Sequence, residues 1–195
     1  MTAITPLEFI HKKGIFGNHH KKNEIDLLKI SEVKELTIIQ IVKFKKSKMA
    51  IDTTNIDGLK LPKQSLMVNS NEKTRILWSA PRTWLVISRK ENLGRIVKDS
   101  CNQQDFAITD ISHSRSIVQL EGKGASEVLK KGCPINFNEF KKNGCASTVF
   151  QGINILVDKI DDNPEKFNLF VLRSFGESFY HDLTDASLEN GYVGV

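Results

Sequence analysis

Cysteine is scarce in this sequence, and long apolar segments are missing from it. The chain has 195 residues but only three cysteines, Cys101, Cys133 and Cys145, and their spacing matches no zinc-ligand or CxxC pattern. This odd and sparse set predicts reduced structural thiols rather than a disulfide scaffold. The longest mainly apolar runs, such as residues 36–42, have the length of a strand and are far too short to span a bilayer.

The N-terminus also lacks the features of a secretory signal. Residues 1–6 carry no basic side chain, and no continuous apolar region follows them. A hydrophobic fraction of 39% and a charged fraction of 26% are typical of a globular chain in water. We therefore expect a cytoplasmic protein, with a core large enough for one large domain or two small ones.

Motifs that hold phosphates, dinucleotides or metals are missing too. No GxGxxG follows a predicted strand, and Gly122-Lys-Gly-Ala-Ser is too short for that motif, so its glycines indicate the start of a helix. Neither a Walker loop nor HExxH occurs. The pair His19 and His20 lies beside lysines and supplies too few ligands for a metal. We expect no catalytic, cofactor-binding or metal-binding residues in this chain.

The formal net charge is +5, and much of the excess is concentrated in two lysine clusters. They comprise Lys12, Lys13, Lys21 and Lys22, and then Lys43, Lys45, Lys46 and Lys48. Basic patches bind nucleic acid, anionic cofactors or acidic partners. Phe44 is the aromatic residue within the second cluster, and the sequence has no recognition-helix or RNA-binding motif. The pattern favours a solvated surface, with a basic nucleic-acid-binding module as an alternative.

The residue pattern that predicts secondary structure is weak before residue 35 and clearer after it. Glycines, histidines and lysines interrupt any periodicity in residues 1–34, which predicts an irregular N-terminal arm that lies on a partner. A strand is predicted over residues 36–44, a loop over 49–72, two strands over 75–88 with a turn at 79–82, and a helix over 91–101.

The second half shows the same kinds of element more plainly. A strand is predicted over residues 116–121, a helix from 122 to 131, a hairpin formed by 146–150 and 153–160, a strand over 167–172 and an amphipathic helix over 175–188. This order predicts an α+β fold in which helices cover mixed or antiparallel sheets. We treat the two halves, about 35–105 and 106–195, as candidate ferredoxin-like pseudo-repeats of one domain spanning 35–195.

Several ordered blocks resemble the gamma subunits of heterotetrameric sarcosine oxidases. The first is Thr109-Asp-Ile-Ser-His-Ser-Arg-Ser-Ile-Val-Gln-Leu-Glu-Gly, and Ala125-Ser-Glu-Val-Leu-Lys-Lys-Gly-Cys-Pro-Ile-Asn follows it. Cys145-Ala-Ser-Thr, Phe167-Asn-Leu-Phe-Val-Leu-Arg-Ser-Phe-Gly-Glu-Ser-Phe and, upstream, Ser79-Ala-Pro-Arg-Thr-Trp-Leu-Val also fit. The resemblance extends over roughly residues 75–190, and the agreement of several blocks in order is more specific than any single block.

The resemblance implies a fold like that of the folate-binding aminomethyltransferases, which are related to the glycine-cleavage T-protein. It implies a non-catalytic accessory subunit, inactive alone, that packs chiefly against the alpha subunit of an alpha-beta-gamma-delta complex. Flavins, NAD and tetrahydrofolate are then expected in the partner subunits, which demethylate sarcosine. The T-protein motif whose acidic residue engages folate has no match here, and Asp161-Asp162 is interpreted as a solvated turn. A free-standing folate-binding one-carbon transferase remains an alternative.

One polar cluster precedes a predicted strand and invites a catalytic interpretation. It contains Asp110, Ser112, His113, Ser114 and Arg115. His113 as a general base oriented by Asp110 would need a serine within reach, but neighbours in an extended chain point to opposite faces. The spacing favours a structural or interface network, in which Asp110 and Ser112 bind backbone amides and Arg115 bridges elements or subunits.

Two further pairs are candidates for an interface. Arg173 and Glu177 lie four residues apart around a predicted helix start, which fits either an ion pair within the chain or a contact with a partner. Trp78 and Trp84 are candidate interface aromatics, because tryptophan is enriched at protein interfaces. Core packing of at least one of the two is the other interpretation.

Overall fold

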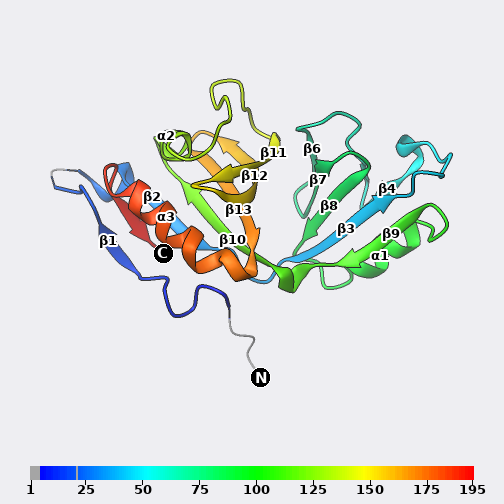
Figure 1. Ribbon diagram of the computed structural model, residues 1–195, viewed down its shortest axis with the longest axis horizontal. Helices are drawn as coiled ribbons and strands as arrows, with labels where there is room; N and C mark the ends of the chain where they lie inside the picture. The colour runs from blue at the N-terminus through cyan, green and yellow to red at the C-terminus, as the bar shows by residue number, and fades with distance from the viewer. Residues whose placement is uncertain (1–4, 21) are drawn as a thin grey trace. The chain divides into compact units, whose positions relative to one another are not determined.

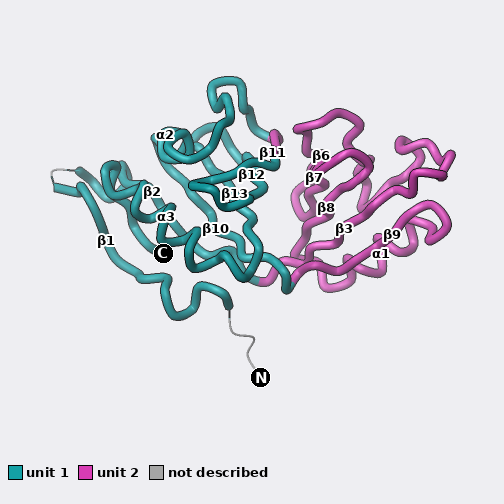
Figure 2. Tube along the Cα trace, in the orientation of Figure 1, with its two compact units in different colours: residues 1–34, 113–142, 147–195 teal, residues 35–112, 143–146 magenta. Residues whose placement is uncertain are grey.

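The computed structural model describes residues 5–20 and 22–195 and separates the chain into two compact units (Figure 2). Unit 1 contains residues 1–34, 113–142 and 147–195, and unit 2 contains residues 35–112 and 143–146. Residues 1–4 of the predicted arm and Lys21 of its basic cluster lie outside the described residues. Both units combine sheets with helices, which confirms the predicted α+β class (Figure 1). In the ranges described, no helix is both long and apolar enough to cross a membrane.

Unit 1 is built on a mixed sheet that has seven strands in the described part of the chain. In spatial order the strands are β1 (Gly14–Phe16), β14 (Tyr192–Gly194), β2 (Leu28–Glu32), β10 (Arg115–Glu121), β13 (Glu165–Leu172), β12 (Ile153–Asp162) and β11 (Cys145–Phe150). β10 pairs antiparallel with β2 and β13, and β14 pairs parallel with β2. The strands β10 to β13 include every strand predicted after residue 115.

Two α-helices pack on β10 and β13: α2 (Ala125–Lys130) and α3 (Gly176–Ser187) (Figure 1). In α3, Phe179 and Leu183 lie four residues apart, so they share the inward face, and both are fully buried. Short 3₁₀ turns connect elements of this unit: η1 (Glu24–Asp26), η3 (Ser112–Ser114), which begins at the last residue of unit 2, and η4 (Arg173–Phe175). The amphipathic patterns that predicted α2 and α3 therefore match the faces that the helices bury.

The prediction of an irregular N-terminal arm is wrong for the described residues. β1 and β2 belong to the sheet of unit 1, and Leu28 and Ile30 of β2 are buried in its core. Ile30 lies opposite Leu120 of β10 in the ladder. Two alternating apolar positions are too short a pattern to predict a strand. Pairing with remote strands therefore determines that this segment is extended.

Unit 2 contains a second sheet, and its order is β6 (Val68–Ser70), β7 (Thr74–Ala80), β8 (Thr83–Ser88), β3 (Thr37–Lys43) and β9 (Phe106–Asp110). α1 (Leu93–Ser100) packs against β3 and β9 and buries Leu93 and Val97. The predicted loop over residues 49–72 instead contains η2 (Ile51–Thr53), a small hairpin of β4 (Asn55–Ile56) and β5 (Leu59–Lys60), and β6. Residues 106–112, predicted to belong with the second half, lie in unit 2.

All three cysteines are buried, and none of them forms a disulfide, as the sequence predicted. Burial raises the pKa of the Cys101 thiol to about 11 and that of Cys133 to about 12, because the thiolate would lose its hydration. The Sγ atom of Cys145 lies 3.1 Å from the carbonyl oxygen of Trp78. These thiols are therefore structural rather than nucleophilic.

A carboxylate holds the β4–β5 hairpin of unit 2 to the neighbouring strands. Asp57 forms an ion pair with Lys90, and the hydroxyl of Thr74 donates to its Oδ2 atom at 2.5 Å. Thr74 is fully buried, and the Asp57 side chain is 16% exposed. Hydrogen bonds from Lys90 and Thr74 lower the pKa of Asp57 from its ordinary value.

The Asp57→Asn variant is expected to reduce the acid sensitivity of unit 2. Because the pKa of Asp57 is lower in the folded chain, its stabilisation is complete above the unfolded pKa and is lost as pH falls through the folded value. At pH 7 the variant should lose about 1–2 kcal/mol of unfolding free energy. Urea titrations monitored by circular dichroism between pH 7 and pH 2 should show this difference shrinking toward zero; a constant difference would contradict the assignment.

Candidate functional site

The polar cluster near residue 112 forms a local network in unit 2. The Oγ atom of Ser112 donates to Asp110 Oδ1 at 2.6 Å and accepts the backbone N–H of Ile38 at 2.9 Å. The backbone N–H of Ser112 also donates to Asp110 Oδ1, at 2.9 Å. A backbone amide of β3 is thus capped by a side chain that follows β9. This is the structural network that the spacing of polar residues favoured over catalysis.

The remaining residues of the cluster do not assemble a catalytic triad. The His113 side chain is exposed, and among the residues that the structure describes it makes no hydrogen bond or ion pair. A general base needs a nucleophile within hydrogen-bond reach, and in the described residues His113 has neither Asp110 nor a serine as a hydrogen-bond partner. Arg115 begins β10 and is partly buried.

The pair Arg173 and Glu177 lies at the beginning of α3. Both side chains are exposed, and Arg173 belongs to η4. The Oε1 atom of Glu177 lies 3.9 Å from Nε2 of His181 on the next turn, which forms an ion pair when the imidazole is protonated. At this exposure such a pair contributes little to stability, so Glu177 remains available to a partner.

The two tryptophans differ in their surroundings. Trp84 is 1% exposed, lies in the core cluster of unit 2, and donates its indole N–H to the carbonyl oxygen of Pro62 at 2.9 Å. Its prediction as an interface aromatic is therefore wrong, because the core surrounds the ring and satisfies its polar atom. Trp78 lies opposite Trp84 in the β7–β8 ladder and packs against the same cluster while partly exposed. Trp78 therefore remains a candidate interface residue.

Unit 1 contains a buried cation that the sequence analysis did not identify. Lys159 of β12 is 4% exposed, and its Nζ atom lies 2.9 Å from Asp162 Oδ1 and 3.7 Å from Glu165 Oε1. The same ammonium group donates to the carbonyl oxygen of Phe140 at 2.9 Å and lies 5.3 Å from the centre of the Phe167 ring. The charged pair Asp158 and Lys159, which directly follows the apolar residues 155–157 of β12, was the signal that the sequence analysis missed.

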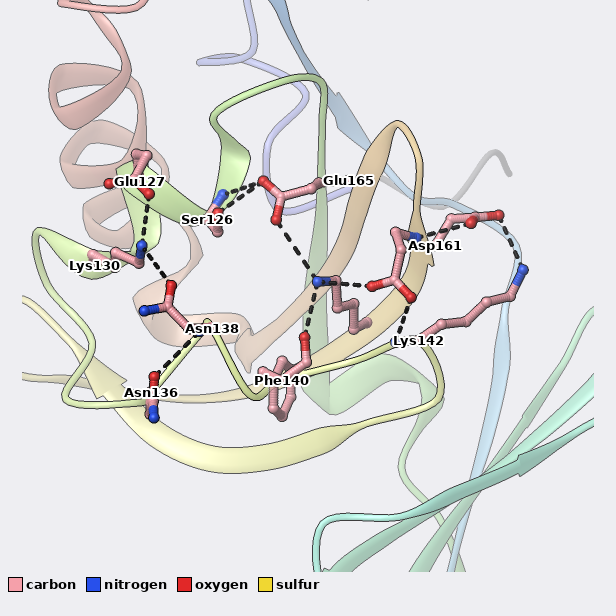
Figure 3. Close-up of polar contacts among 11 residues, drawn as sticks. Ser126, Glu127, Lys130, Asn136, Asn138, Phe140, Lys142, Asp161 and Glu165 are labelled. Carbon is pink, nitrogen blue, oxygen red and sulfur yellow. Dashed lines mark hydrogen bonds and ion pairs between the residues drawn. The ribbon is translucent and has the colours of Figure 1, made fainter.

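This network has a structural role, because each group in it holds another in place. The other oxygen of Glu165 accepts the backbone N–H and the hydroxyl of Ser126 at the start of α2, at 3.0 and 2.8 Å (Figure 3). Lys159 lowers the pKa of Asp162, and Lys142 lowers that of Asp161. Asp161 and Asp162 are the last residues of β12 rather than turn residues, and both form ion pairs, but their side chains are 44% and 47% exposed, so the predicted solvation is confirmed.

A surface hollow beside α2 is lined by charged side chains, two of whose lysines form ion pairs. Its residues are Lys22, Glu127, Lys130, Lys131, Glu189 and Asn190. Lys130 Nζ lies 2.6 Å from Glu127 Oε1, and Lys131 Nζ lies 2.8 Å from Glu189 Oε2. Lys22 Nζ donates to the carbonyl oxygen of Asn190 at 2.9 Å, so each of these three described lysines already has a partner within the chain. Within the described ranges, no group of three metal-ligating side chains is brought together.

Comparisons with known proteins identify the relatives of this fold. Residues 45–189 match the model of the "Sarcosine oxidase, gamma subunit family". The chain is similar to the sarcosine oxidase subunit gamma of Corynebacterium sp. (strain U-96), with 30% identity over 60% of this chain and 57% of that one. The corresponding subunit of Corynebacterium sp. (strain P-1) is 28% identical over 68% of this chain and 66% of that one. Both alignments thus span less than two thirds of the relatives.

Solved structures extend the similarity of fold to nearly the whole chain. A chain of the heterotetrameric sarcosine oxidase from Corynebacterium sp. U-96 in complex with pyrrole 2-carboxylate matches with a TM-score of 0.80 and 22% identity, over 97% of both chains. The glycine cleavage system aminomethyltransferase T from Bartonella henselae matches with a TM-score of 0.58 and 11% identity, over 88% of this chain and 49% of that one. These matches confirm the predicted aminomethyltransferase-like fold.

Proposed function

Because this chain belongs to the sarcosine oxidase gamma subunit family, we propose that it is an accessory, non-catalytic subunit of a heterotetrameric sarcosine oxidase. The family match over residues 45–189 carries this proposal, and it favours neither a free-standing folate-binding transferase nor a nucleic-acid-binding module. The nucleic-acid interpretation rested on Lys43, Lys45, Lys46 and Lys48, of which Lys43 is partly buried in β3 and the other three are exposed.

The proposed contribution of the chain to the complex is a binding surface rather than catalytic residues. Its polar networks act within the chain, since Ser112 caps a backbone amide and Lys159 is bound to two carboxylates and a carbonyl oxygen. The oxidation of sarcosine to glycine, with flavins, NAD and tetrahydrofolate, is then assigned to the larger subunits. We place the chain in the cytoplasm, chiefly in contact with the alpha subunit.

The test is co-expression of this chain with candidate alpha, beta and delta subunits from the same source. Size-exclusion chromatography should show all four chains in one peak with flavin absorbance, and this peak should oxidise sarcosine. The purified chain by itself should be colourless and inactive. The matched control is the same three subunits expressed without this chain, which should form a less stable complex.

Two results would contradict the proposal. If the chain never elutes with the other subunits, it is not part of such an assembly. If the isolated chain binds tetrahydrofolate tightly and transfers a one-carbon unit, it is an enzyme in its own right.

A further inference from the structure

At one end of the sheet in unit 1, a partly buried arginine lies near two exposed apolar side chains. Arg115 is the first residue of β10, and its partner in the antiparallel ladder is Leu172, the last residue of β13. Directly opposite residues project from the same face, with Cβ atoms about 5 Å apart. The turn η4 (Arg173–Phe175) follows Leu172 directly, so Phe175 lies one short turn of chain beyond Leu172. Together these residues form what we call the Arg115 surface (Arg115, Leu172 and Phe175).

Two properties distinguish the Arg115 surface from ordinary exposed polar surface. Leu172 is 41% exposed and Phe175 is 49% exposed, so two large apolar side chains contact water. Arg115 itself is partly buried, yet within the described residues it makes no side-chain hydrogen bond, ion pair or ring contact. Burial lowers the pKa of its guanidinium, because the cation loses hydration.

In the isolated chain, the partial desolvation of Arg115 is therefore unfavourable in free energy, and a binding partner that supplies a counter-charge can offset it. A partly desolvated cation without a counter-charge is unfavourable, whereas the buried Lys159 of the same unit has two carboxylates and a carbonyl oxygen. A guanidinium offers five donors in a planar fork that matches a carboxylate in a bidentate arrangement. A carboxylate is accordingly the complementary group for Arg115.

The apolar flanks indicate a protein partner rather than a small anion. A small carboxylate would satisfy Arg115 but would leave Leu172 and Phe175 in water. Arginine and aromatic residues are enriched at the centres of protein interfaces, where surrounding apolar contacts exclude water from the charged pair. We propose that the Arg115 surface docks a partner subunit of the oxidase that presents a carboxylate to Arg115 and apolar side chains to Leu172 and Phe175. This inference rests on the proposed function.

The first measurement compares complex formation by the full chain and its variants. Immobilised wild-type chain, Arg115→Met and Arg115→Lys are titrated with the complex of the other three subunits. Arg115→Met should weaken binding at least about 30-fold, because the partner's carboxylate is left without a cation. Arg115→Lys should recover only part of this loss, because an ammonium group keeps the charge but not the fork. Arg89→Met, at an exposed arginine of unit 2, is the matched control and should bind like the wild type.

The second measurement separates docking from a structural role. Arg115→Met should leave the melting temperature of the free chain unchanged or raise it, because it removes a desolvated cation without a partner. A lower melting temperature would show that Arg115 stabilises this chain itself, and the inference would be wrong. If the wild type binds and Arg115→Met binds within twofold of it, the inference fails while the subunit assignment stands. If the wild type does not bind, both fail.

Discussion

The Trp84→Ala variant is expected to lose about 3–5 kcal/mol of unfolding free energy in unit 2. The indole ring is 1% exposed and packs among the buried side chains that join the sheet to α1, including Ile41, Val86 and Val97. Truncation removes its apolar contacts and opens a cavity that this strand-lined core can only partly fill. It also leaves the carbonyl oxygen of Pro62 without its donor.

Urea denaturation followed by far-ultraviolet circular dichroism measures this loss without relying on tryptophan fluorescence. The matched control is Trp78→Ala, which deletes the same atoms at the opposing position of the β7–β8 ladder, where the ring is partly exposed. Trp78→Ala should lose clearly less unfolding free energy than Trp84→Ala. Trp84→Phe should fall between the two, because it keeps most of the ring volume and loses the indole N–H. Equal losses for Trp78→Ala and Trp84→Ala would contradict the assignment of Trp84 as the core residue.

The Lys159→Met variant should destabilise unit 1 by about 2–3 kcal/mol. Methionine nearly fills the volume of lysine, so the loss reports the missing charge rather than a cavity. Glu165, whose side chain is 22% exposed, would lose its cation and keep its hydrogen bonds from Ser126, and the Phe140 carbonyl oxygen would lose its donor. Asp162 is 47% exposed and can be hydrated, which keeps the loss below that of breaking a fully buried pair.

Lys142→Met provides the control for this variant. Lys142 Nζ lies 3.1 Å from Oδ2 of Asp161, which belongs to β12 like Lys159. The side chains of Lys142 and Asp161 are 51% and 44% exposed. Loss of such an exposed pair should cost under about 1 kcal/mol. Thermal and urea unfolding of both variants should give a clear difference between them. If Lys142→Met is as destabilising as Lys159→Met, burial does not decide the strength of these pairs.

Local sequence patterns determined the elements whose hydrogen-bond partners lie nearby. The hairpin of β7 and β8 was predictable because apolar runs flank a turn at Pro81, and that of β11 and β12 because Gln151-Gly152 separates two strands. α3 was predictable from the four-residue spacing of Phe179 and Leu183. The cap formed by Ser112 followed from the known tendency of serine and aspartate to bind nearby backbone amides.

Strands with distant partners were not predictable in this way. β2 is stabilised by β10, nearly ninety residues later, and by the parallel strand β14, which has three residues. At Gly194 of β14, an added Cβ atom would lie 2.0 Å from the carbonyl oxygen of Lys12. That close approach explains a glycine in a strand, but the approach exists only in the folded chain.

By itself, the sequence determined the α+β class, the reduced thiols, the hairpins, the helices and the family, because each of these depends on residue types at short spacing. The tertiary structure alone decided that β1 and β2 join the sheet of unit 1 and that Trp84 is buried while Trp78 is partly exposed. It also decided that Lys159 is paired, whereas Arg115 has no partner among the residues that the structure describes. Burial and charge pairing depend on which distant segments come together. Hydrogen-bonded contacts between remote strands, rather than local propensity, set those positions.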